Sequence, residues 1–291
     1  MKHHLYIGNR LYFSWSLAAW LMVDRFGLSD KVDTTVLYPA SEDDVAALLT
    51  NLAPAKTLPT MVTAGGAILS DSMAIAEELA SLYPDAGLWP QDSVARGTAR
   101  TLANEMHSGF RALRGGWPMN LHRSFQPVMP PADVAAELDR LEVNWTHARQ
   151  TTATEGPWLC GDYSIADAIF APMAVRLANY GFDTRPATRS YVAAHLADPA
   201  LRRWRAMGLA AGKASAVFEH DRTIRPWPGP APLPAAPVTH GRSENAICPY
   251  SGKPVTHLMG MQGRTFGFCN VVCRDKTVAD PAAWPAFMAM L

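Results

Sequence analysis

The sequence carries little charge and no net excess of either sign. Only 18% of its 291 residues are charged, and 26 Lys and Arg balance 26 Asp and Glu. A neutral chain has no overall attraction for nucleic acid or for an anionic membrane surface. It also lacks an apolar run of about 20 residues, which a membrane helix needs, and Met1 is not followed by a secretory signal. We therefore expect no nucleic-acid or membrane partner and a cytoplasmic location.

Cysteine is scarce as well, and its placement is uneven. Cys160 stands alone, whereas Cys248, Cys269 and Cys273 fall within the last 44 residues. In a reducing compartment, clustered cysteines favour metal binding over disulfides. The end of the chain is therefore the segment in which we expect a metal site.

What the chain has in abundance is hydrophobic residues, which make up 48% of it and exclude intrinsic disorder. Because domains commonly contain about 100 to 200 residues, the length predicts two domains and a small third piece. The composition favours a soluble protein that acts on small molecules.

Residues 1–84 combine strand-like alternation with helical periodicity, which predicts an α/β domain. Gly65 and Gly66 indicate a hairpin, and Ser41 can cap a helix. The predicted order is strand, helix, strand, helix, strand, strand, helix, over residues 5–8, 15–26, 31–38, 42–51, 60–64, 67–69 and 71–83.

The next segment changes character, because strand-like alternation almost disappears and the helical period dominates from residue 93 to 216. We therefore predict an all-helical domain over residues 92–218. A proline-rich segment, 219–244, follows and favours an extended tether. That tether should isolate a small cysteine-containing module, 245–291. The helices predicted between the first domain and the tether cover residues 93–114, 131–153, 164–180, 187–196 and 199–216.

Two motifs in the first domain can present binding groups to a small ligand. Leu58 and Pro59 lead into a predicted strand, and Asp71 and Ser72 begin a predicted helix. Each motif also has a purely structural interpretation, since prolines often begin strands and Asp-Ser often caps helices. A serine hydroxyl and free amides at a helix start can nevertheless bind a carboxylate, and an acid can pair with an ammonium.

Residues 1–218 resemble the cytosolic glutathione transferases, in which these two motifs occur in the same order. A bacterial subgroup of that family is similar in two further places, namely Ser-Trp-Ser-Leu at residues 14–17 and Glu-Met-His-Ser-Gly-Phe at 105–110. The resemblance implies a thioredoxin-like first domain, an all-helical second domain and a homodimer. It also implies that Leu58 and a cis Pro59 bind the cysteinyl backbone of glutathione, and that Asp71 and Ser72 hold its γ-glutamyl end.

The helical domain carries one further element of the resemblance, at residues 164 and 167. Ser164 and Asp167 are similar to a capping box of the family, which is structural and begins a buried helix.

Catalysis in this family requires little more than a group that favours the thiolate of glutathione. A cysteine-like thiol has a pKa near 8.5, so a hydroxyl donor at a helix N-terminus can activate it. Ser14 fits this role best, and Ser16 and Tyr12 are the alternatives. Counting back from the helix, the position used by several transferase classes falls near Leu11, which leaves the identity of the hydroxyl open. Ser14 can also be a simple helix cap.

The electrophile should bind between the two domains. If the resemblance holds, Met106, His107 and Phe110 face the glutathione sulfur. Met and aromatic residues at helical spacing are also typical of a core, and His107 can equally be packed or exposed.

The tail resembles small metal-binding modules of the YHS and TRASH type, with a Cys-Pro start, a Phe-Cys-x-x-x-Cys centre and an Asp-Pro end. Cys248, Cys269 and Cys273 can supply three of the four ligands of tetrahedral zinc, with His257 as the candidate for the fourth. Ser251 stands where many relatives have a further cysteine, so an open or lost site is the alternative. A structural ion would stabilise a segment too small for a large core.

Two functions remain at this point. The first is a glutathione transferase that attacks a small electrophile with the thiolate of glutathione. The second is a non-catalytic binding or regulatory protein on the same scaffold, in which the tail senses metal or docks a protein partner. A third idea, isomerisation or peroxide reduction with glutathione, is not distinguished from conjugation by the sequence.

Overall fold

In the computed structural model, which describes residues 1–153, 155–215, 218 and 221–291, the chain begins with a four-stranded sheet. The spatial order is β2-β1-β3-β4, with β1 parallel to β2 and antiparallel to β3. Parallel neighbours need a crossover, which a helix between β1 and β2 provides. The strands are β1 (His3–Ile7), β2 (Val32–Val36), β3 (Thr60–Val62) and β4 (Ile68–Leu69).

The helices of this domain are α1 (Ser14–Arg25), α2 (Glu42–Leu48) and α3 (Ser72–Leu82), with short 3-10 turns η1 (Thr50–Leu52) and η2 (Pro84–Ala86). Helix α1 is buried from Ser16 to Val23 because it contacts α3 of its own domain as well as the second domain. A helix that is apolar on every face is the expected result of contacts on every side. This is the thioredoxin-like arrangement that the resemblance implies.

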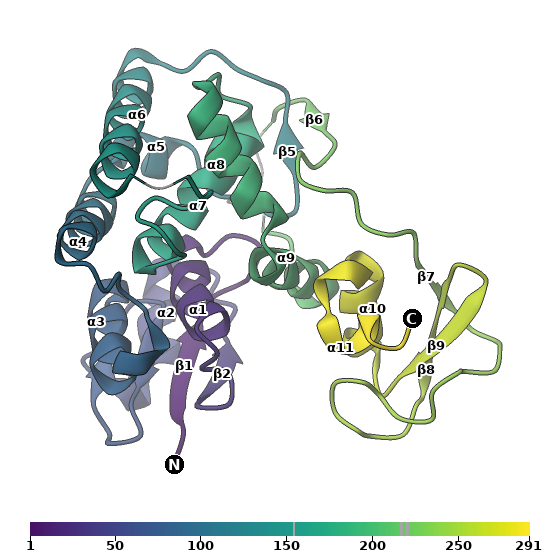
Figure 1. Cartoon of the computed structure of the whole chain (residues 1–291). Helices are drawn as coiled ribbons and strands as arrows, with labels where there is room; N and C mark the ends of the chain where they lie inside the picture. Colours follow the sequence, from purple (N-terminus) through teal and green to yellow (C-terminus); the bar gives the residue numbers. More distant parts are fainter. Residues whose placement is uncertain (154, 216–217, 219–220) are drawn as a thin grey trace.

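The second domain consists of helices around α7, which is buried along its whole length. The predicted capping box of α7 is confirmed, because the Ser164 and Asp167 side chains each accept a hydrogen bond from the other's backbone N–H. The helices are α4 (Ser93–Ser108), α5 (Arg111–Gly116), α6 (Ala132–Thr152), α7 (Ile165–Tyr180), α8 (Pro186–Ala197) and α9 (Pro199–Ala211). Figure 1 shows most of them above the sheet, coloured from blue through teal to green.

Two helix predictions for this domain need correction. The helix expected over 93–114 is broken into α4 and α5, because Phe110 adopts a left-handed conformation with φ of 53°. That conformation turns the Phe110 side chain into the core. The helix expected over 199–216 ends at Ala211 in the structure, and residue 216 lies outside the described residues.

The described part of the proline-rich segment, 221–244, contains no helix, as predicted, but it does not isolate the tail. Its strand β6 (Ile224–Arg225) pairs with β5 (Ser124–Phe125) of the helical domain. Further along, β7 (Ala236–Val238) is the edge strand of a three-stranded sheet with β8 (His257–Met261) and β9 (Arg264–Phe268). The tether expectation was therefore wrong for residues 236–238, which form a ladder with the tail.

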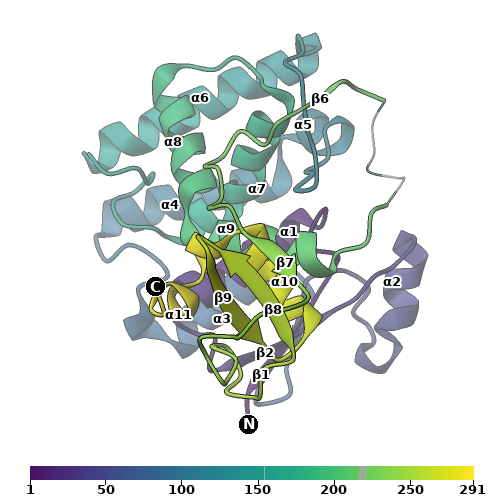
Figure 2. The ribbon, with the colours of Figure 1, turned by 90° about the vertical axis from the view of Figure 1, so that its right-hand side faces the viewer.

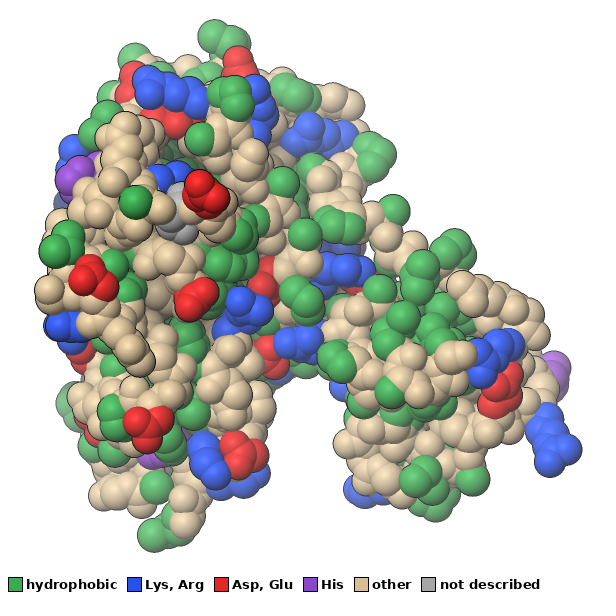
Figure 3. Space-filling view, viewed as in Figure 1, with side chains coloured by type: hydrophobic (Ala, Val, Ile, Leu, Met, Phe, Trp, Pro, Cys, Tyr) green, Lys and Arg blue, Asp and Glu red, His purple; other side chains and the backbone are tan. Residues whose placement is uncertain are grey.

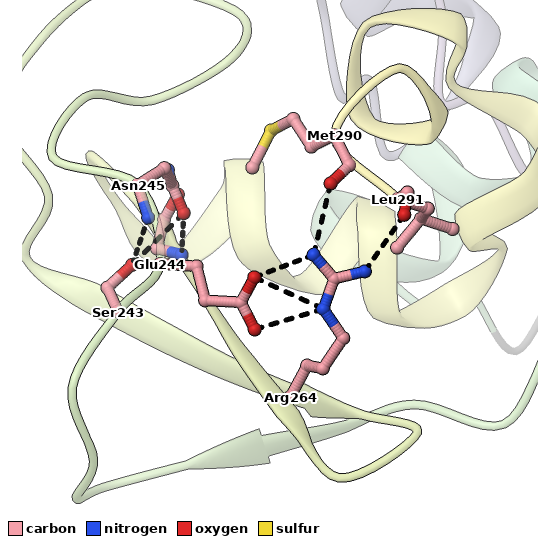
Figure 4. Close-up of polar contacts among 7 residues, drawn as sticks. Ser243, Glu244, Asn245, Arg264, Met290 and Leu291 are labelled. Carbon is pink, nitrogen blue, oxygen red and sulfur yellow. Dashed lines mark hydrogen bonds and ion pairs between the residues drawn. The ribbon is translucent and has the colours of Figure 1, made fainter.

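The tail is completed by α10 (Val271–Ala279), η4 (Pro281–Ala283) and α11 (Pro285–Met288). Its core contains Met259, Phe266, Phe268 and Phe287, all fully buried. Figure 4 shows how the last residues are held: Arg264 forms an ion pair with Glu244 at 2.6 Å and donates hydrogen bonds to the carbonyl oxygens of Met290 and Leu291.

The tail docks on the helical domain through α10, which lies against α9 (Figure 2). The Arg202 guanidinium makes two hydrogen bonds to the Asp280 carboxylate, at 2.8 and 2.7 Å, and both side chains are largely buried. Arg203 donates to the Ala283 carbonyl and pairs with Asp24 of α1. Figure 3 shows the tail as a lobe that joins the rest of the molecule on one side, with a notch between the tail and the first domain.

Candidate active site and cysteine cluster

The loop between β1 and α1 is held by the helical domain. The Asn9 side-chain amide donates to the Lys213 carbonyl at 2.6 Å, and the Trp204 indole N–H donates to the Arg10 carbonyl at 2.7 Å. The Leu11 carbonyl accepts a hydrogen bond from the N–H of Leu121 at 2.9 Å. The start of α1 is thus positioned by contacts from outside its own domain.

Helix α1 begins at Ser14, and the residue before it, Phe13, provides no side-chain cap. Ser14 is therefore not the helix cap, which was the structural alternative for this residue. The first N–H groups of an uncapped helix are open to an anion, and the helix dipole favours negative charge there.

The three candidate hydroxyls differ in accessibility. Ser14 is half-buried and lines a cavity of about 580 Å³, a size typical of small-molecule sites. Ser16 is fully buried, and its hydroxyl accepts the Gly8 N–H at 3.1 Å. Tyr12 borders the same cavity but is almost wholly buried, and its hydroxyl accepts the Ser215 N–H at 3.4 Å. Of the three, Ser14 offers its hydroxyl to the cavity.

The motif before β3 borders this cavity from the other side. Leu58 lines it together with Lys56 and Thr57, and the Leu58–Pro59 peptide bond is cis. In the described part of the chain no group hydrogen-bonds to the Leu58 backbone. The N–H and carbonyl of Leu58 can therefore pair with an extended peptide in the cavity.

Asp71 and Ser72 begin α3. One Asp71 oxygen accepts the N–H groups of Met73 and Ala74, at 2.8 and 3.0 Å, so Asp71 is a helix cap. The other oxygen lies 2.9 Å from Nε2 of His107 on α4. Ser72 is buried. The carboxylate is half-exposed but already engaged by groups of this chain, which the sequence did not show.

A second cavity adjoins the first at Ser14 and Trp15, and we call it the arginine cavity. Of the residues expected at the electrophile, His107 lines it, whereas Met106 and Phe110 belong to the core. Sequence reasoning missed its three guanidinium groups; one signal was Arg176, a basic residue within the largely apolar helix α7. The cavity is lined by Ser14, Trp15, His107, Ser108, Arg111, Arg114, Gly115 and Arg176.

Arg176 is the residue of this cavity that touches Ser14. Its Nη2 lies 3.3 Å from Ser14 Oγ, and its other nitrogens donate to the carbonyls of Trp117 and Pro172. Burial first, and the neighbouring charge of Arg114 second, lower the pKa of Arg176 to about 10. The group still carries its charge at neutral pH, so it places a cation beside the Ser14 hydroxyl.

The structure brings the three tail cysteines together. The sulfur atoms of Cys248, Cys269 and Cys273 all lie within 4.8 Å of one another, and those of Cys269 and Cys273 are 3.9 Å apart. Zinc–sulfur bonds of about 2.3 Å in tetrahedral geometry place sulfur atoms about 3.8 Å apart. The three thiols therefore fit a tetrahedral ion.

His257 does not join this group. Its Nδ1 contacts the Thr256 hydroxyl at 2.9 Å, and the metal-ligating atoms that converge among the described residues are the three sulfurs. The group next to the sulfurs is instead Ser251, whose hydroxyl lies 3.1 Å from Cys269 Sγ. His257, on β8, was the candidate for the fourth ligand, but the structure does not place it with the sulfurs.

The electrostatics of the cysteines are unequal. Burial acts to raise the pKa of Cys248, but the backbone N–H groups of Cys269 and Tyr250 and the Ser251 hydroxyl outweigh it and lower this pKa to about 7. Burial, with the nearby sulfurs, raises the pKa of Cys273 to about 11. Three sulfurs this close favour a cation among them, because their negative forms repel one another.

The thioredoxin-like sheet, the cis proline and the helical second domain together define the glutathione S-transferase fold. Residues 13–82 match the family model "Glutathione S-transferase, N-terminal domain". None of the curated proteins matches the sequence. None of the described helices is long and apolar enough to span a membrane.

Solved structures support the same fold. A glutathione transferase homolog from Burkholderia gl BGR1 with bound glutathione is 22% identical, covers 72% of this chain and 100% of its own, and has a TM-score of 0.52. A glutathione transferase from Methylococcus capsulatus str. Bath is 20% identical, covers 71% and 98%, and also has a TM-score of 0.52.

Ure2p in complex with glutathione is similar too, with 18% identity, coverage of 70% and 94%, and a TM-score of 0.52. Likeness at such identities establishes the fold rather than the activity. The bacterial subgroup and the tail module, two finer resemblances, stay predictions.

Proposed function

We propose that this protein is a glutathione transferase that activates the thiol of glutathione for attack on a small electrophile. The observation that carries the proposal is the position of Ser14, an accessible hydroxyl at an uncapped helix start, in a cavity also lined by Leu58. Glutathione-bound structures with the same fold add support.

Glutathione would lie along the first cavity with its cysteinyl backbone paired to Leu58. Lys56 lines the same cavity and provides a cation for a carboxylate of the peptide. The half-exposed Asp71 carboxylate and the start of α3 are our candidates for the γ-glutamyl end. The Asp71 carboxylate would then contact both the γ-glutamyl end of glutathione and His107.

The proton geometry at Ser14 suits a thiolate. Because Arg176 donates to Ser14 Oγ, the hydroxyl proton is left to be donated to another acceptor. A thiolate placed there would also face the N–H groups of α1 and the charge of Arg176. All three effects favour the thiolate over the thiol, which is the form that attacks an electrophile.

The test compares the parent chain with Ser14→Ala in a conjugation assay with glutathione and an aryl halide. Removing one hydrogen bond to an anionic sulfur should lower kcat/KM by about 10- to 100-fold. The ultraviolet absorption of bound thiolate should decrease in parallel. Ser190→Ala, at an exposed serine on α8, is the matched control. A parent that binds glutathione but conjugates nothing would refute the transferase proposal.

A second candidate function, a metal-responsive binding protein, is favoured by the docking of the tail. Helix α10, which carries Cys273, lies on α9, and α9 holds the site loop through Trp204 and Arg10. Metal binding at the cysteines would therefore act on a helix that touches the glutathione site. Docking of a protein partner on the tail is the other role we keep for it.

Zinc is our candidate ion, held by Cys248, Cys269 and Cys273, with Ser251 beside the fourth position. The ion would supply structural stability to a small module. Metal analysis of the full chain and of Cys269→Ser tests the ligands, and Cys160→Ser is the control because Cys160 is buried elsewhere. Equal metal content in the parent and Cys269→Ser would contradict this ligand set. Glutathione affinity that is the same with and without metal would contradict the regulatory role.

Two other expectations stay proposals. We propose a homodimer, as the family resemblance implies, and analytical ultracentrifugation measures it directly. We also propose the division into a first domain, 1–84, a helical domain, 92–218, and a tail module made of residues 245–291 together with β7. Limited proteolysis, followed by mass analysis of the fragments, tests those boundaries.

A further inference from the structure

The arginine cavity has a charge that the chain does not balance. Arg111, Arg114 and Arg176 line one cavity next to Ser14, and in the described part of the chain no carboxylate lies within 4 Å of any of their guanidinium groups. His107 is the remaining ionisable residue of the lining, and it is engaged by Asp71. Three cations around one cavity indicate that an anion belongs there.

Arg176 is the strongest evidence for a bound anion, because it is only 5% exposed. Its hydrogen bonds go to two backbone carbonyls and to the Ser14 hydroxyl, which are neutral groups. Buried charges in proteins are normally paired, since an unpaired one loses its hydration without compensation. A bound anion would supply the missing partner.

The Arg114 side chain is also held in a position to bind an anion in this cavity. One of its nitrogens donates to the carbonyls of His107 and Gly109, both at 2.9 Å, and its guanidinium lies over the Trp15 ring at 4.8 Å. These contacts fix the side chain and leave other N–H donors available, because a guanidinium has five. Arg111, on the first turn of α5, is exposed and has no hydrogen-bond or ion-pair partner among the described residues.

Glu137 of α6 does not neutralise the cavity. Burial first, and the charge of Arg111 second, lower the pKa of Arg114, while Glu137 acts in the opposite direction. The Glu137 oxygens accept the N–H groups of Ala112 and Leu113 at 3.1 and 2.8 Å. Glu137 therefore stabilises the start of α5 and is not part of the cavity lining. The positive field at the cavity remains.

Building on the proposed transferase function, we propose that the arginine cavity binds the anionic group of the second substrate, and that this substrate is a carboxylate-bearing electrophile. Glutathione has its own cation, Lys56, in the first cavity, and the two cavities meet at Ser14 and Trp15. A thiolate at Ser14 would thus face an electrophile held by its carboxylate. The aromatic ring of Trp15 suits an electrophile with a flat apolar body.

The reaction with a suitable probe balances without any further reagent. With a chloronitrobenzoate, the sulfur forms a bond to the ring carbon, and the carbon–chlorine bond breaks. Chloride leaves with the electron pair, and the thiol proton goes to the solvent. The methyl ester of the same compound reacts in the same way but carries no charge, so the pair isolates the contribution of the carboxylate.

The experiment measures kcat/KM for the acid and its methyl ester with the parent, Arg111→Gln, Arg111→Lys and Arg114→Gln. We expect the parent to prefer the acid, and each Gln variant to reduce the ratio of acid to ester by about tenfold, as removal of one charged hydrogen bond predicts. Arg111→Lys should retain most of the preference, because it keeps the charge. Arg242→Gln, at an exposed arginine of the tail, is the control.

Calorimetric binding of the same two compounds separates this proposal from the transferase proposal. In one outcome the protein conjugates neither compound and still binds the acid more tightly than the ester, with this difference lost in Arg111→Gln. That result would support the anion site and contradict the transferase proposal. Equal handling of acid and ester by the parent and Arg111→Gln would overturn the anion site. An effect of Arg111→Gln on glutathione affinity alone would also overturn it, because the arginines would then serve glutathione.

Discussion

Stability in mild acid should depend on one buried histidine, His195 on α8. The residue is 1% exposed and lies among Trp158, Tyr163 and Tyr191, with ring centroids 4.5 to 6.4 Å away. Its Nε2 is buried and has no hydrogen-bond partner in the described structure. Burial, and to a lesser degree the charge of Arg25, lower the pKa of His195 to about 3.

The direction of the effect follows from the two pKa values. In the unfolded chain His195 takes up a proton near pH 6.5, whereas in the folded chain it resists until about pH 3. Protonation therefore favours the unfolded state throughout this window, and stability falls as the pH falls. Each pH unit below the unfolded-state pKa lowers the free energy of unfolding by about 1.36 kcal/mol. Between pH 8 and pH 4.5, His195 therefore lowers this free energy by about 2.7 kcal/mol.

The assay is urea unfolding at pH 8 and pH 4.5 for the parent and His195→Phe, which keeps a ring in the cluster but cannot titrate. The variant can differ in absolute stability, because Phe fills a different volume, and the quantity compared is the loss between the two pH values. We expect that loss to be about 2.7 kcal/mol smaller in the variant. His240→Phe, at an exposed site, is the control. Equal losses in the parent and His195→Phe would refute the reasoning.

Three further changes have defined outcomes. Asp167→Ala leaves the buried N–H groups of Leu159 and Ser164 without their acceptor and should cost about 3 to 5 kcal/mol in chemical unfolding, whereas a loss below about 1 kcal/mol would contradict the role of this capping box. Arg202→Ala removes both hydrogen bonds to a largely buried Asp280 and should release the tail, seen as faster hydrogen exchange in α10; unchanged exchange would contradict the docking. Gly8→Ala should weaken glutathione binding measured by calorimetry, because the added methyl group overlaps the Phe13 ring before α1, and unaltered affinity would contradict that coupling.

The parts of the fold that the sequence predicts well are those set by local signals. The α1 crossover, the hairpin at Gly65 and Gly66 and the Ser164 cap depend on a few neighbouring residues, and the structure has all three. The cis bond at Pro59 is also present, as the resemblance implies. Local chemistry is enough in these places because caps and turns are decided within a few residues.

The break between α4 and α5 shows why periodicity fails elsewhere. Met106, Phe110 and Leu113 are four and three residues apart, so the apolar pattern continues across the break as if the helix did. The backbone is left-handed at Phe110 and changes direction there, and the Phe110 side chain is still buried in the same core. Spacing records which residues are buried, but it does not record the path of the backbone between them.

The candidate site shows a second limit, since its charges come from segments far apart in the sequence. Arg176 contacts Ser14 across 162 positions, and a single arginine in an apolar helix gives no indication of its partner. The difference among Tyr12, Ser14 and Ser16 likewise depends on burial and on hydrogen bonds to distant residues. His257 was named as the fourth ligand without knowledge of its position, whereas the sulfurs of Cys248, Cys269 and Cys273 converge in the structure.

The clamp on the loop between β1 and α1 bears on how this protein can be engineered. Hydrogen bonds connect Asn9, Arg10 and Leu11 to Lys213, Trp204 and Leu121 of the helical domain. Residues of both domains therefore determine the geometry of the site. A chimera that joins the first domain of one homologue to the helices of another at residues 84–91 would separate these partners. Such a graft should carry the loop and the facing residues of α9 together, and mutant libraries aimed at new substrates gain most by varying them as one unit.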